Sequence, residues 1–154
     1  MKSIVLQKLV ITNFKGIKNL IINFSEITDI FAANGLGKTT IFDSFTWLLF
    51  GKDSLDRKDF EIKPLDINGI SIPKIENEVE GMLLFNGEEI VLKRIHREKW
   101  TKKKGNPEPE FTGNETIYFW NDVPMSAKEY TAKINDLLDE QVFKLISNPL
   151  AFNN

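Results

Sequence analysis

The chain has 154 residues and a formal net charge of −2, so no overall field draws it to nucleic acid or to anionic lipid. It is long enough for one domain with a real core, and its 42% hydrophobic and 27% charged residues are ordinary for a folded protein. The absence of cysteine excludes disulfides and thiolate metal sites. Because it lacks both a signal-peptide pattern and a membrane-length apolar run, we expect a cytoplasmic protein without a membrane partner.

The N-terminal part of the chain predicts strands. Apolar side chains recur through residues 4–14, and a second β-rich run at 20–24 follows a break at Lys15-Gly16. Their spacing predicts an antiparallel hairpin. A third strand is expected over 27–31, where it leads directly into a glycine-containing loop.

A helix should follow this loop and end near Phe50, with Gly51 as its left-handed C-terminal residue. Its apolar residues form a stripe at helical spacing, and Phe42 and Trp47 lie outside that stripe. The helix is therefore apolar nearly all round and should be deeply buried. We interpret its aromatic residues as core rather than as a platform for base stacking.

The middle of the chain predicts an irregular connection and then a hairpin. Residues 52–78 are polar and contain prolines and a glycine, so short strands are expected there at most. Two β-rich runs, 79–85 and 89–96, flank Asn86-Gly87. This dipeptide favours a type I′ turn, which joins antiparallel strands.

The last part of the chain predicts a loop, a strand and a helical end. Residues 101–114 carry three lysines, two prolines and two glycines, which is typical of a mobile surface loop. A strand is expected over 116–120. Ser126 and Glu129 have the spacing of a capping box, so a helix should span about 127–138.

The stretch from Ala32 to Thr39 approaches the phosphate-binding-loop pattern, which lies between a strand and a helix. Its glycines allow successive backbone N–H groups to face an anion, and the helix N-terminus adds its positive dipole end. Lys38 can reach the β- and γ-phosphates and is the candidate catalytic residue, while the Thr39 hydroxyl can bind Mg²⁺. The candidate ATP-binding residues of the motif are Ala33, Asn34, Gly35, Leu36, Gly37, Lys38, Thr39 and Thr40.

Ala32 departs from the pattern, because it stands where the first glycine belongs. If that position needs positive φ, a Cβ costs about 1–2 kcal/mol. The loop can tolerate that cost, or it can be reshaped so that nucleotide binding weakens, and the sequence leaves both open. A plain strand-to-helix turn is the alternative for the whole motif. It is disfavoured because Lys38 at the start of a buried helix has no packing rationale and would be a cation at the positive helix end.

Three segments carry a resemblance to a known group of ATPases. Residues 13–17 (NFKGI) followed by 34–43 (NGLGKTTIFD) resemble the N-terminal lobe of SMC, SbcC and RecF-like heads. Residues 47–54 (WLLFGKDS) are similar to bacterial and phage SMC-like AAA-family ATPases. The resemblance is strongest over 1–60 and returns around 143–152. It implies an α/β P-loop NTPase fold, namely an ABC-type head lobe whose mixed sheet has an antiparallel β subdomain and a buried P-loop helix, with ATP and Mg²⁺ as cofactors.

Other site residues are assigned only through this resemblance. Lys15 would approach the nucleotide phosphates or ribose, and residues 60–63 would lie near the adenine. Asn148 would take the place of the glutamine that senses Mg²⁺ and the attacking water, and Gln141 is the other candidate. Ordinary turn roles are the alternatives for Lys15 and for Asn148, which precedes Pro149.

The resemblance also implies motifs that this sequence lacks, the Walker B strand and the signature segment. We therefore expect a fragment, a single N-terminal lobe over 1–154 that does not hydrolyse ATP alone. Within it we expect a P-loop core at 1–52, a β-rich subdomain at 53–125 and a helical end at 126–148. The implied partners are the C-terminal lobe of the same head and a second head in a dimer. An unpaired sheet edge should make the isolated chain self-associate.

A run of positive residues falls close together between positions 93 and 104. Heads of the resembled group can bind DNA on this lobe, and charge alone would attract phosphates, so the run is a candidate DNA-binding surface. A solvated hairpin end is the alternative. The run comprises Lys93, Arg94, Arg97, Lys99, Lys102, Lys103 and Lys104.

The function indicated is the ATP-binding half of a head from DNA repair, recombination, or chromosome or phage DNA processing. One alternative is a non-hydrolysing interaction module derived from a P-loop protein, with a weakened nucleotide site. Another P-loop class, such as an ABC transporter domain, is disfavoured because the candidate sensor Asn148 lies too far beyond Lys38 in sequence.

Overall fold

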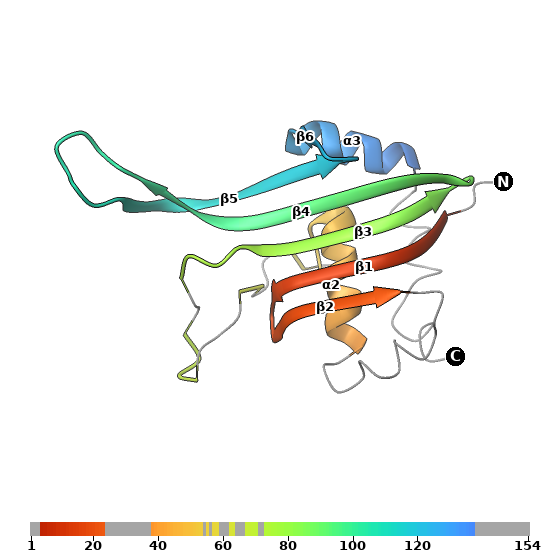
Figure 1. The fold of residues 1–154 in the computed structure, drawn as a ribbon, viewed down its shortest axis with the longest axis horizontal. Coiled ribbons are helices and arrows are strands. Elements are labelled where there is room, and N and C mark those ends of the chain that lie inside the picture. The colour runs from red at the N-terminus through yellow and green to blue at the C-terminus, as the bar shows by residue number, and fades with distance from the viewer. Residues whose placement is uncertain are drawn as a thin grey trace.

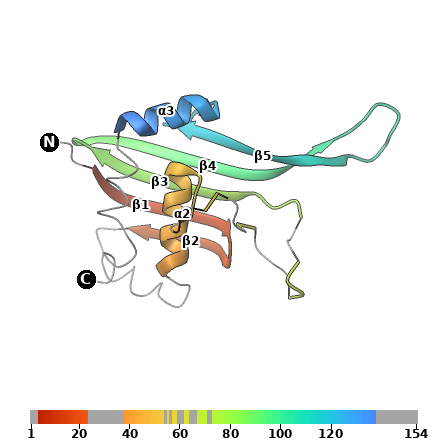
Figure 2. The same ribbon diagram turned by 180° about the vertical axis from the view of Figure 1, so that it is seen from behind.

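The computed structural model describes residues 4–23, 38–53, 55, 57–58, 62–63, 67–70 and 73–137. Within these residues, six strands form one sheet in the order β2-β1-β3-β4-β5-β6, and every neighbouring pair is antiparallel. Two described helices, α2 and α3, lie on the same side of the sheet (Figures 1 and 2). The elements are β1 (Ile4–Phe14), β2 (Ile17–Asn23), α2 (Lys38–Phe50), β3 (Asn77–Phe85), β4 (Glu88–Thr101), β5 (Glu110–Trp120), β6 (Val123–Met125) and α3 (Ala127–Leu137).

Strands β1 and β2 form the expected hairpin. Phe14 pairs with Ile17 across the turn Lys15-Gly16, so β2 begins earlier than its apolar run predicted. The left-handed φ of 51° at Lys15 allows the chain to reverse within so few residues. Because β1 also pairs with β3, residues from both sides of the expected boundary at 52–53 belong to one sheet, and the subdivision of the lobe stays a prediction.

Helix α2 confirms the expected buried helix. Residues 41–49 are all buried, including the aromatic Phe42 and Trp47, because the apolar residues surround the helix instead of forming one stripe. The helix ends as predicted at Phe50, and Gly51 follows with a φ of 72°. The Gly51 N–H donates a 2.9 Å hydrogen bond to the Trp47 carbonyl oxygen, which closes the last turn.

The core lies between α2 and one face of the sheet. Alternation along β3 turns Val79, Gly81 and Leu83 toward α2, and all three are buried. Gly81 marks the closest approach, since a Cβ there would lie 2.7 Å from Leu48 Cδ2 on α2. The largest fully buried apolar side chains are Tyr130, Phe14, Leu9, Ile11, Ile17, Ile22, Leu48, Leu92, Ile134 and Val79.

The hairpin around Asn86-Gly87 is confirmed, and both turn residues have positive φ, 48° and 83°, as a type I′ turn requires. The expectation of a loop over 101–114 is wrong. Strand β4 continues to Thr101 and β5 begins at Glu110, so only 102–109 connects them. Backbone pairing between β4 and β5 keeps these residues in strands although their composition favours a turn. A register shift between Lys99 and Trp100 interrupts the pairing.

Helix α3 confirms the capping box. The Glu129 backbone N–H donates a 3.1 Å hydrogen bond to Ser126 Oγ, and Ser126 Oγ donates to Glu129 Oε1 at 3.0 Å. The helix packs on the sheet through Tyr130 and Ile134, which are buried. Neither described helix is long and apolar enough to cross a membrane.

Several expectations lie outside the described residues. They are the third strand at 27–31, the irregular segment 60–61, the loop residues 32–37, and the chain beyond Leu137 with Gln141 and Asn148.

Candidate functional site

The candidate phosphate-binding element is the N-terminus of α2, which begins at Lys38, where the motif predicted a helix start. Backbone N–H groups in a first helical turn have no intrahelical acceptor and carry the positive end of the dipole. No acidic residue lies in the first turn of α2, so no carboxylate of that turn repels a bound anion. The described end of the motif therefore fits a phosphate group. The motif residues 33–37 and the side chains of Lys38 and Thr39 lie outside the description.

Lys15 connects the β1–β2 turn to this helix. Its Nζ lies 2.7 Å from Oδ2 of Asp43, whose side chain is only 4% exposed. Its backbone N–H donates a 2.8 Å hydrogen bond to the Ile62 carbonyl oxygen. Asp43 lies four residues after Thr39, on the same face of α2 and one turn further along. The structure thus brings Lys15 to the N-terminal half of α2, beside the motif, while a contact with nucleotide stays a prediction.

Asp43 was not singled out by sequence reasoning. The signal that points to it is the one charged residue within a fully buried stretch of helix, residues 41–49. A buried carboxylate needs a charged or hydrogen-bonding partner, and the partly exposed Lys15 supplies one.

The Lys15–Asp43 contact should appear as a coupling energy. We expect Lys15→Met and Asp43→Asn each to destabilise the fold, and the double variant to cost about 1–2 kcal/mol less than the sum of the two. Urea unfolding followed by circular dichroism gives the four free energies. Additive values would show that the contact contributes nothing to stability.

The expectation that Arg94 belongs to a basic surface is wrong. Its side chain is buried on the helix side of the sheet. Its Cζ lies 5.5 Å from the Trp47 ring centroid, 4.8 Å from that of Tyr118 and 5.4 Å from that of Tyr130. Burial lowers the pKa of Arg94 from its usual value. Alternation along β4 explains the error, since every second residue of a charged run faces the opposite side of the sheet.

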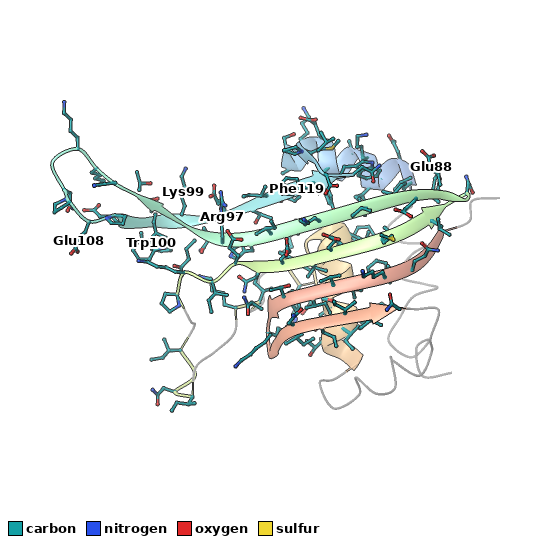
Figure 3. All side chains as sticks on the ribbon, viewed as in Figure 1. Glu88, Arg97, Lys99, Trp100, Glu108 and Phe119 are labelled. Atoms are coloured by element: carbon teal, nitrogen blue, oxygen red, sulfur yellow. The ribbon has the colours of Figure 1, made fainter. Side chains whose placement is uncertain are left out.

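Two further members of the run lie on the other face of the sheet beside acidic residues. Lys93 Nζ lies 3.2 Å from Glu80 Oε2, on the neighbouring strand β3. Arg97 Nε lies 2.8 Å from Glu115 Oε1, its cross-strand partner on β5 (Figure 3). These cross-strand pairs offset the positive charge near the body of the sheet. The remaining lysines lie farther along the β4–β5 ribbon.

The described residues contain no group of three or more His, Cys, Asp or Glu side chains that could hold a metal ion. His96 Nδ1 lies 3.4 Å from Thr116 Oγ1 on the neighbouring strand. A surface strand position for this histidine is therefore the better interpretation.

A model of the AAA domain family matches residues 8–152. The chain belongs to this family. This AAA domain is also similar to two solved structures. One is the recombination mediator protein RecF with ATP, at 14% identity and a TM-score of 0.51, covering 87% of this chain and 31% of that one. The other is an Smc head bound to the C-winged helix domain of ScpA, at 20% identity and a TM-score of 0.51, covering 94% of this chain and 41% of that one.

These likenesses confirm the expected fold, an α/β P-loop ATPase head, and the resemblance to the N-terminal region of SMC and RecF-like heads. The AAA domain spans less than half the length of either solved chain. No curated protein matches it.

Proposed function

We propose that this AAA domain is the ATP-binding half of an SMC/RecF-like ATPase head that serves DNA repair, recombination, or chromosome or phage DNA processing. The observation that carries the proposal is the start of a buried helix at Lys38, within the phosphate-loop motif and without an acidic residue in its first turn. The family match supports it, as does the likeness to a RecF structure determined with ATP.

In this proposal residues 33–40 surround the triphosphate, and Lys15 lies beside it. Lys38 neutralises charge on the β- and γ-phosphates, and Thr39 and Asn148 bind Mg²⁺. The metal would supply charge neutralisation at the phosphates when bound. The sequence contains no Walker B carboxylate. We therefore propose that this half-site binds ATP but does not hydrolyse it without the C-terminal lobe.

Completion of the head would come from its C-terminal lobe and from a second head, and the proposed location is the cytoplasm. Strand β2 is at one end of the described sheet and presents Ile21 with 55% of its surface exposed. Such an edge supports the proposal that the isolated chain self-associates or requires a complementing lobe.

Calorimetry of Mg-ATP binding tests the proposal directly. We expect the purified chain to bind Mg-ATP without hydrolysing it. Lys38→Ala should weaken the affinity about 10- to 100-fold, because one charge-assisted hydrogen-bonding group on the phosphates is removed. Lys18→Ala, at an exposed position on β2, is the matched control and should leave the affinity unchanged.

An unchanged affinity in Lys38→Ala would show that the phosphate assignment is wrong. If the unmodified chain binds no ATP at millimolar concentration, the interaction module with a weakened site becomes the better function. Ala32→Gly and addition of the C-terminal lobe then separate the two causes. Recovery with glycine would locate the defect in the loop, and recovery only with the lobe would locate it in the missing half.

A further inference from the structure

The β4–β5 ribbon extends beyond the rest of the sheet. Strand β3 begins at Asn77, which pairs with His96, so the residues of β4 after His96 pair only with β5 among the described strands. Figures 1 and 2 show this ribbon projecting past the ends of the other strands. We call residues 97–115 the arm.

The base of the arm is braced by Glu98. Its Oε2 accepts hydrogen bonds from the Lys74 backbone N–H at 3.0 Å and from Trp100 Nε1 at 2.9 Å. Its Oε1 lies 3.3 Å from Lys63 Nζ. The hydrogen bond from Lys74 contributes most to holding the pKa of Glu98 below its usual value. The Glu98 carboxylate therefore connects the base of the arm to the segment that precedes β3, and these contacts hold the arm in one orientation.

Two large aromatic side chains lie on the surface of the arm. Trp100 pairs with Phe111 across the two strands, and their ring centroids are 5.7 Å apart. They are 37% and 51% exposed, whereas the aromatic residues of α2 and α3 are buried or partly buried. Lys74 Nζ lies over the Trp100 ring, 4.5 Å from its centroid, and adds a cation to the pair. The result is an exposed π surface with positive charge next to it.

The tip of the arm is rich in lysine. Lys103 Nζ lies 3.2 Å from Glu110 Oε2. Lys102 and Lys104 are exposed and have no ion pair within the described part of the chain. An open hollow of about 570 Å³ is lined by residues 102–107. The basic residues near the body of the sheet, Lys93 and Arg97, are paired with carboxylates. The positive charge of Lys102 and Lys104, left unpaired among the described residues, therefore lies at the tip.

Lys99 lies next to Trp100 in sequence but on the opposite face of the ribbon, as alternation requires (Figure 3). Glu108, also at the tip, is the one carboxylate of residues 99–110 besides Glu110. Lysines therefore outnumber carboxylates over this stretch, and the aromatic face and the tip together offer rings and cations to one ligand.

We propose that the arm binds single-stranded nucleic acid. Unpaired bases stack on Trp100 and Phe111, and the phosphates contact Lys102 and Lys104. Base stacking on aromatic side chains together with a positively charged track is the general chemistry of sequence-tolerant single-strand binding. A duplex offers phosphates to the lysines but keeps its base faces stacked, so it cannot use the two rings. The proposal deepens the proposed function by naming a partner, and it rests on that function only for its biological setting.

Fluorescence anisotropy with a labelled oligothymidylate, on the full chain without ATP, tests the arm. Trp100→Val with Phe111→Val, which keeps β-branched residues in the strands, should weaken the affinity at least about tenfold and leave the salt slope unchanged. Lys102→Gln with Lys104→Gln should reduce the slope of log affinity on log salt by about 1.4, the value for two phosphate contacts on a single strand. Phe111→Val alone keeps the Trp100–Glu98 hydrogen bond and should weaken binding in the same direction.

Lys18→Gln with Lys128→Gln is the matched control, since both lysines are exposed and lie outside the arm. It makes the same charge change and should leave the salt slope as it is in the unmodified chain. A duplex of the same length should bind more weakly and should not respond to the valine pair.

The proposal is overturned if the chain does not bind oligothymidylate, or if arm variants bind it as the unmodified chain does. It is also overturned if polyglutamate binds equally well and the valine pair has no effect, because the arm is then a charge-only site for an acidic protein. ATP calorimetry on the arm variants separates the two proposals. A chain that binds the oligonucleotide but not ATP refutes the nucleotide site and supports the arm, and the reverse result refutes the arm alone.

Discussion

Replacing Tyr130 with alanine should lower the free energy of unfolding by about 3–5 kcal/mol, the range for removing a large buried aromatic side chain. Tyr130 is fully buried on α3, and its ring centroid lies 5.1 Å from that of Tyr118. Its hydroxyl donates a 2.8 Å hydrogen bond to the Leu48 carbonyl oxygen near the end of α2. Burial raises the pKa of Tyr130, so the phenol stays neutral and able to donate. The substitution also opens one wall of the enclosure around Arg94.

Urea unfolding measured by circular dichroism gives the size of this effect. Tyr130→Phe removes only the hydroxyl and should cost about 1–2 kcal/mol, because the Leu48 carbonyl loses its donor while the ring stays packed. Thr131→Ala, at an exposed position of α3, should change the stability by less than about 0.5 kcal/mol. A loss below about 1 kcal/mol in Tyr130→Ala would mean that α3 does not dock as described.

The elements that could be predicted from sequence are those whose signals are local. The all-round apolar pattern of α2, the Asn86-Gly87 turn and the Ser126–Glu129 capping box depend on neighbours within a few residues, and the structure confirms them. The arm was missed because its stability comes from pairing between β4 and β5. Local composition over 101–114 indicates a loop, whereas the ladder from Arg97–Glu115 to Thr101–Glu110 holds both strands extended.

The candidate site also has a part that local sequence predicts and a part that depends on contacts between distant residues. Lys38 is predicted from a contiguous motif, because the pattern of a phosphate-binding loop occupies adjacent residues, and its contact with phosphate stays a prediction. The contact of Lys15 with Asp43 joins residues 28 positions apart and depends on the β1–β2 turn lying against α2. Arg94 was misplaced because a run of basic residues does not show which of them an aromatic cluster from three other elements will enclose.

Substitutions at the contact between Gly81 and Leu48 should also lower the free energy of unfolding strongly, and the two losses should partly cancel when they are combined. Gly81→Ala places a Cβ 2.7 Å from Leu48 Cδ2, and Leu48 is fully buried, so the overlap should cost about 1–3 kcal/mol. Leu48→Ala leaves a cavity between α2 and the sheet and should cost about 2–5 kcal/mol. In the double variant the new methyl group occupies part of that cavity. Its total cost should therefore fall below the sum of the two by at least about 1 kcal/mol.

The same double-mutant cycle tests whether packing affects the proposed nucleotide site, because α2 carries Lys38 at one end and Leu48 near the other. If Gly81→Ala relieves its overlap by shifting α2, Mg-ATP affinity should fall in that variant and recover when Leu48→Ala is added. Urea unfolding and calorimetry on the four proteins separate the two responses. Gly87→Ala, whose added Cβ meets no atom within 4 Å but whose φ is 83°, is the matched glycine control: it should lose stability through backbone strain without losing ATP affinity. Additive stabilities in the Gly81–Leu48 cycle would contradict the described contact between β3 and the helix.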